Sequence, residues 1–88
     1  MPDINEILQK FSEDIVKNIN IKNVEQIIVF LQTNNCDYCE ELLEDYLDLF
    51  IIEIDEFKLK FKTLNSKYNN SFLEYAKNDM NLFEKFYN

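Results

Sequence analysis

The chain has 88 residues, enough for one small domain over residues 1–88 and too few for two. It carries 17 Asp and Glu against nine lysines and no arginine, a net charge of −8. Lys/Arg patches dominate the affinity of nucleic-acid binders, so we expect no direct contact with nucleic acid and instead a basic protein partner. The chain lacks histidine and glycine. It therefore has no Cys–His or Ser–His catalytic pair and no glycine-rich phosphate loop, and we expect no cofactor.

We expect no signal peptide in the amino-terminal stretch. Residues 1–20 carry acidic side chains throughout and lack the continuous apolar segment of a signal peptide. No stretch of the chain approaches the length of a membrane span. The sequence therefore predicts a small, soluble, cytoplasmic protein without a membrane partner. In that reducing compartment a pair of cysteines spaced CxxC is more often redox-active or metal-binding than a structural disulfide.

The first predicted element is an amphipathic helix. Its apolar residues recur every three or four positions and are assigned to the core: Ile4, Ile7, Leu8, Phe11, Ile15 and Ile19. Asp3 and Glu6 have the spacing of a capping box at its start. The polar residues 18–23 then predict a turn into the first strand.

A strand and a helix are predicted next, with the two cysteines at the helix start. Residues 27–31, IIVFL, form an unbroken apolar run typical of a strand covered on both faces. Asn35 is the expected N-cap of a helix over residues 36–48, which places Cys36 in the first turn. There the free N–H groups and the helix dipole stabilise a thiolate, whereas the neighbouring Asp37 raises the thiol pKa. Cys39 follows one turn later on the same face, as a nucleophilic thiol and a resolving thiol require.

The four residues Cys36-Asp37-Tyr38-Cys39 resemble the Cys-Pro-Tyr-Cys motif of glutaredoxins, with Asp37 in place of the proline. The resemblance to the thioredoxin and glutaredoxin superfamily covers about residues 26–55. It implies that Cys36 attacks the disulfide of a protein substrate and that Cys39 resolves the mixed disulfide. It also implies a thioredoxin-like fold.

Two patterns compete over residues 49–64. A hairpin turning at Asp55 and Glu56 places on one face the apolar residues Phe50, Ile52, Ile54, Phe57, Leu59 and Phe61. A helix instead gives a heptad seam formed by Leu43, Leu47, Phe50, Ile54, Phe57, Phe61, Leu64 and Tyr68. The helix leaves Ile52 and Leu59 on its polar side and the hairpin explains both, so strands are preferred.

A last helix is predicted after the polar residues 64–70. Ser71 and Glu74 have capping-box spacing, and its apolar stripe comprises Phe72, Ala76, Met80, Phe83 and Tyr87. The complete order is helix, strand, helix, strand, strand, helix. This predicts an α/β fold, a small reduced thioredoxin-like βαβ core with flanking helices. The alternative is an all-α bundle with one long central helix.

Three functions fit these patterns. The preferred one is a thiol–disulfide oxidoreductase with Cys36 and Cys39 as its catalytic residues. The alternative is an acidic, non-enzymatic binding or inhibitor protein of immunity type, which resembles small phage inhibitors in size and charge and in which both cysteines are core residues. Its partner-binding residues lie on the CxxC helix, beside Asp37: Glu40, Glu41, Glu44, Asp45 and Asp48. The simpler interpretation of that acidic face, and the one that the sequence favours, is a solvated helix surface. The third is a zinc clasp in which two chains each contribute Cys36 and Cys39.

Overall fold

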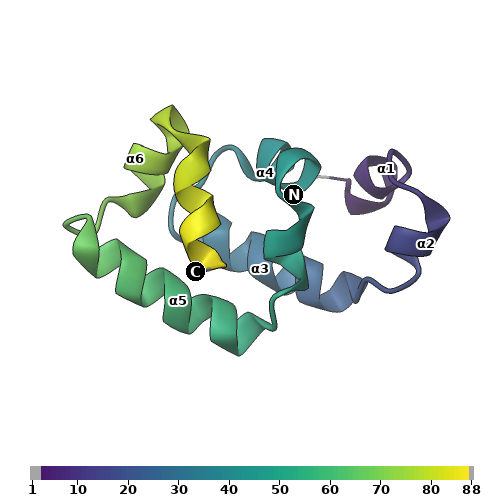
Figure 1. Ribbon diagram of the computed structural model, residues 1–88, viewed down its shortest axis with the longest axis horizontal. Helices are drawn as coiled ribbons and strands as arrows, with labels where there is room; N and C mark the ends of the chain where they lie inside the picture. The colour runs from purple at the N-terminus through teal and green to yellow at the C-terminus, as the bar shows by residue number, and fades with distance from the viewer. Residues whose placement is uncertain (1–2, 88) are drawn as a thin grey trace.

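Helices form all the regular secondary structure in the part of the chain that the computed structural model describes, residues 3–87 (Figure 1). The elements are α1 (Ile4–Leu8), α2 (Glu13–Val16), α3 (Ile21–Thr33), α4 (Cys39–Asp45), the 3₁₀ helix η1 (Leu47–Ile51), α5 (Ile54–Lys67), α6 (Phe72–Asn78) and the 3₁₀ helix η2 (Met80–Phe86). The predicted α/β fold with a βαβ core is therefore wrong. The all-α alternative has the correct class, although its long central helix is divided into α4, η1 and α5.

The apolar run at residues 27–31 belongs to helix α3. Val24, Ile27, Ile28 and Leu31 are fully buried at helical spacing, whereas Val29, inside the run, is 49% exposed. The helix starts at Ile21, inside the turn predicted over residues 18–23, where the Asn20 side chain caps it by accepting a hydrogen bond from Asn23 N at 3.2 Å. A short apolar run has no period of its own, so its neighbours decide between strand and helix.

The predicted hairpin over residues 49–64 is also wrong, because α5 occupies most of it. Phe57, Phe61 and Leu64 are buried along one face of α5, and Leu59 on the opposite side is 66% exposed. The heptad seam thus describes the buried face of α5 correctly. Its continuity fails at Ile52 and Glu53, whose extended backbone (ψ 133° and 139°) separates η1 from α5.

The side chain of Asn23 fixes this break from a distance. Its Nδ2 donates to Phe50 O at 3.2 Å and to Ile52 O at 2.8 Å, and its Oδ1 accepts from Ile54 N at 3.0 Å. Backbone groups that a continuous helix would pair internally are satisfied here by α3.

The predicted amino-terminal helix is divided in two. Asp3 accepts from Glu6 N at 3.2 Å, as the capping-box spacing predicted. Helix α1 ends at Leu8, however, and Ser12 adopts an extended conformation (ψ 152°) before α2. This break moves Ile15 out of the predicted core, and its side chain is 46% exposed.

The last predicted helix is likewise shorter than its apolar stripe. Ser71 is the N-cap residue of α6, as expected, but its side chain makes no capping hydrogen bond, so the predicted capping box is not formed. Asn65 caps the helix instead, by accepting from Phe72 N at 3.1 Å. Phe72 and Ala76 on α6 and Phe83 on η2 are fully buried, whereas Tyr87 is 45% exposed.

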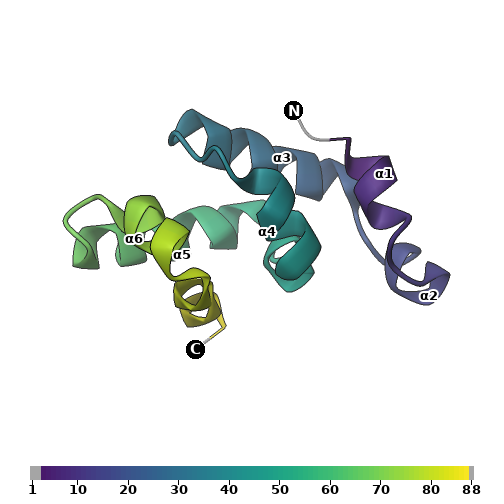
Figure 2. The ribbon, with the colours of Figure 1, turned by 90° about the horizontal axis from the view of Figure 1, so that it is seen from above.

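The hydrophobic core includes an aromatic cluster where α5, α6 and η2 meet. The ring centroids of Phe57 and Phe86 are 4.8 Å apart, those of Phe72 and Phe83 are 5.4 Å apart, and Phe86 lies 6.0 Å from both Phe72 and Phe83. Figures 1 and 2 place α1 and α2 at one end of the molecule and α6 at the other, with α4 between them. Over residues 3–87, no helix is long and apolar enough to cross a membrane.

Candidate functional site

Cys36 belongs to the end of α3 and not to the start of the next helix. Asn35 has a left-handed backbone (φ 69°), a conformation that asparagine tolerates better than most residues. Asn35 N donates to Gln32 O and Cys36 N donates to Leu31 O, both at 3.0 Å. These two bonds form a Schellman motif, in which the residue at the position of Cys36 commonly packs against the helix it terminates. The prediction that Asn35 caps a helix with Cys36 in its first turn is therefore wrong.

Cys39, the first residue of α4, lies close to Cys36. Both cysteines are free and belong to the hydrophobic core, with 5% of Cys36 and 4% of Cys39 exposed. Cys39 Sγ lies 3.9 Å from Cys36 O. A hydrogen bond between the two thiol side chains lowers the pKa of Cys36, although burial opposes this shift. The same thiol–thiol hydrogen bond, together with burial, raises the pKa of Cys39. Cys36 is therefore the thiol of the pair that ionises first.

The residues between the cysteines fasten this turn to α6. The Tyr38 hydroxyl donates to Leu73 O at 2.6 Å in the interior, and burial raises the tyrosine pKa. On the surface, Lys77 Nζ lies 3.0 Å from Asp37 Oδ2 and lowers the pKa of that carboxyl. Asp37 raises the pKa of Cys36, as the sequence indicated, and Lys77 acts in the opposite direction.

Metal binding by a single chain has no support in residues 3–87, where no group of three or more Cys, Asp or Glu side chains is arranged to hold an ion. The zinc clasp still requires a second copy of the chain to complete four ligands.

The acidic face, defined as Glu40, Glu41, Glu44, Asp45 and Asp48, is divided by the fold. Glu40 and Glu41 are exposed in the first turn of α4. Glu44 pairs with Lys10 Nζ at 2.7 Å, which ties the segment after α1 to α4 and raises the pKa of the lysine. Glu44, Asp45 and Asp48 line a groove of about 880 Å³.

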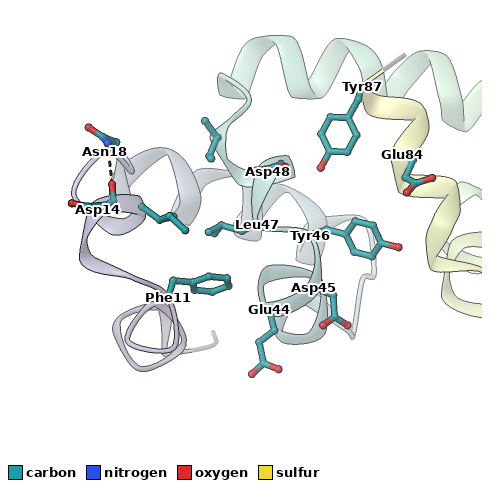
Figure 3. A pocket seen from close by; sticks show the side chains of 12 residues that line it. Phe11, Asp14, Asn18, Glu44, Asp45, Tyr46, Leu47, Asp48, Glu84 and Tyr87 are labelled. Carbon is teal, nitrogen blue, oxygen red and sulfur yellow. Dashed lines mark hydrogen bonds between the residues drawn. The ribbon is translucent and has the colours of Figure 1, made fainter.

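This acidic groove lies between the α1–α2 segment, the α4–η1 segment and the carboxyl-terminal end of the described chain (Figure 3). Its apolar lining comprises Phe11, Ile15, Tyr46, Leu47, Ile51 and Tyr87. Its carboxylates are Asp14, Glu44, Asp45, Asp48 and Glu84. Asn18 is the remaining lining residue, and none of the lining residues is a lysine. Figure 3 shows Phe11 and Tyr87 approaching η1 from opposite sides.

The electrostatic environment of the groove is negative. Burial, together with the carboxylates of Asp48 and Glu84, raises the pKa of Tyr87 to about 12, because a buried phenolate beside negative charge is unfavourable. Negative charge is therefore repelled and positive charge attracted at this end of the molecule.

Sequence reasoning found the acids that α4 and η1 contribute and missed the rest of the groove. Phe11 and Ile15 fell on a predicted core stripe, and Tyr87 fell on another. The Ser12 cap position is the local signal that divides the first stripe and turns Ile15 outward. Comparisons with protein-family models, with curated proteins and with solved structures found no match to this chain.

Proposed function

We propose that this protein is a non-enzymatic binding protein whose acidic face engages a basic surface of a partner protein. The observation that carries this proposal is the acidic groove, in which five carboxylates surround exposed apolar side chains without a lysine among the lining residues. Apolar surface that stays open to solvent and is edged by one sign of charge is typical of an interaction site.

The distribution of charge along the chain supports the same proposal. No lysine occurs between Lys22 and Lys58, and this interval contains all five residues of the acidic face. A field of one sign accelerates encounter with an oppositely charged partner, and salt weakens it by screening. We therefore expect an association rate that falls steeply as ionic strength rises.

Charge reversal tests this proposal. The variant carries Glu40→Lys, Glu41→Lys and Asp45→Lys, and we expect at least about tenfold weaker binding of the partner recovered with the wild-type protein. The measurement is affinity by calorimetry at two salt concentrations, with circular dichroism to confirm the helical fold.

A matched control reverses Glu25, Asp55 and Glu56. This gives the same net charge and also places two of the three changes in the first turn of a helix, in this case α5. The control and a Cys36→Ala/Cys39→Ala variant should both bind with nearly wild-type affinity. Equal binding by the acidic-face variant and its control would refute the proposal.

Thiol–disulfide exchange is a second candidate, supported by the opposite pKa shifts of two neighbouring thiols. In this chemistry the Cys36 thiolate attacks one sulfur of a substrate disulfide and releases the other sulfur as a thiolate. Cys39 then attacks the Cys36 sulfur, closing the intramolecular disulfide and releasing the second substrate thiol, so that two electrons pass to the substrate. The burial of both thiols means that a substrate reaches Cys36 only after local opening.

Redox titration in glutathione buffers, with alkylation of each cysteine followed by mass, tests this candidate. A reversible Cys36–Cys39 disulfide with a potential of about −120 to −270 mV, and loss of exchange in Cys36→Ser, would support it. Thiols that resist alkylation until the protein unfolds would exclude it and leave them as core residues.

A further inference from the structure

The floor of the acidic groove is formed by large apolar side chains that the fold leaves in contact with solvent. Six large hydrophobic residues in the described chain are exposed, and three of them line this one hollow: Ile15 at 46%, Ile51 at 54% and Tyr87 at 45%. Exposed apolar residues on small proteins are normally scattered singly. Their convergence from α2, η1 and the carboxyl-terminal end indicates a surface that is covered by a partner.

The rim of the groove specifies the charge of that partner. Glu44 is paired with Lys10 and Asp14 with Lys17, whereas neither Asp45 nor Asp48 forms an ion pair within residues 3–87. An apolar floor beside unneutralised carboxylates favours a segment with apolar residues on one side and Lys or Arg along its edges.

We infer that the acidic groove binds a basic amphipathic helix of a partner protein. This inference rests on the proposed function and deepens it by naming the class of partner segment. A volume of about 880 Å³ accommodates several apolar side chains of a helix, which recur at helical spacing along one face. Binding by strand addition would require a sheet edge, and residues 3–87 contain no strand. Nucleic acids and anionic membrane surfaces are repelled by the rim.

The test uses two synthetic peptides of identical leucine and lysine composition. In the first, leucines fall at helical spacing along one face, and in the second the same residues are scrambled so that no apolar face forms. Binding to the 88-residue protein is measured by calorimetry, and the site is located by nuclear magnetic resonance shifts at Ile15, Asp48 and Ile51. We expect only the amphipathic peptide to bind tightly and to become helical.

Apolar truncations on the protein complete the design. Ile15→Ser and Ile51→Ser should each weaken the amphipathic peptide about tenfold, because each removes exposed floor without opening the core. Leu59→Ser is the matched control, since Leu59 is 66% exposed on α5 outside the groove, and it should bind as wild type does.

The outcomes separate this inference from the proposed function. Suppose that both peptides bind with equal, salt-sensitive affinity and that neither Ile15→Ser nor Ile51→Ser weakens this binding. That result would overturn the helix-in-groove inference and would leave only an acidic docking surface. Failure of both peptides to bind at low salt would overturn the inference and count against the proposed function as well.

Discussion

Single residues hold this fold at positions where the backbone leaves a helix, and Asn23 is the strongest case. Its amide makes three hydrogen bonds to the backbone on both sides of the break between η1 and α5. We expect Asn23→Ala to lower the free energy of unfolding by about 1–3 kcal/mol, because partly buried backbone groups lose their partners. Urea denaturation measures the change. Asn18→Ala, which removes one exposed bond to Asp14 O, is the control and should cost less than half as much; equal losses would contradict the role of Asn23.

The stability of the protein depends on pH through the side chain of Tyr87. Its pKa in the folded protein is about 12, against 10.0 for an ordinary tyrosine. Because the folded state holds this proton more tightly, the stability contributed by neutral Tyr87 is complete below pH 10 and is lost as the pH rises towards 12. Tyr87→Phe should therefore lose less stability than wild type at alkaline pH. In an absorbance titration of its tyrosines, the phenolate that forms near pH 12 in the wild-type protein should be missing. The buried Tyr38 shifts in the same direction and remains in both proteins. A Tyr87 phenolate that forms at the same pH in folded and unfolded protein would disprove the expectation.

The start of α5 shows how one cap defines an element. Glu53 accepts hydrogen bonds from Asp55 N at 3.0 Å and Glu56 N at 3.4 Å. Glu53→Ala should lower the free energy of unfolding by about 0.5–2 kcal/mol, as loss of an N-cap does. Glu53→Gln, which keeps an acceptor oxygen, should retain part of this contribution. Chemical denaturation followed by circular dichroism compares the two variants, and an alanine variant as stable as wild type would show that the cap is dispensable.

The elements also show which features of the fold are readable from sequence. The heptad seam located the buried face of α5, and the Asp3 and Ser71 positions marked helix starts, because both signals are local. The break after η1 depends on Asn23, which lies 31 residues before Ile54, and no local pattern encodes it. Residues 27–31 were misassigned because a short apolar run fits a strand and a buried helix equally.

The candidate site follows the same division. The sequence identified Glu44, Asp45 and Asp48 as acidic residues on the surface of one predicted helix. Their position beside Ile15 and Tyr87 depends on three segments that meet only in the folded chain, and sequence spacing contains no signal for it.

At the scale of the whole molecule, stability depends on the aromatic cluster that joins α5, α6 and η2. Phe72 is fully buried at its centre, with ring contacts to Phe61, Phe83 and Phe86. We expect Phe72→Ala to cost about 3–5 kcal/mol, which is a large part of the roughly 5–15 kcal/mol that stabilises a typical domain. Thermal and urea unfolding measure the loss. The half-buried Phe11, at the other end of the molecule, is the control, and Phe11→Ala should cost clearly less. A Phe72 variant no weaker than the Phe11 variant would place the main core elsewhere.

The packing of sequence neighbours on one another has a kinetic consequence. Helix α4 packs on η1, α5 packs on α6, and α6 packs on η2, so much of the core closes over short loops. Chains rich in such local contacts lose little loop-closure entropy on the way to their transition state, and they fold in microseconds to milliseconds. The only proline is the second residue, so slow prolyl isomerisation has no site within the helical body. Stopped-flow refolding should therefore show one rapid phase, which leaves the exposed apolar chain little time to aggregate.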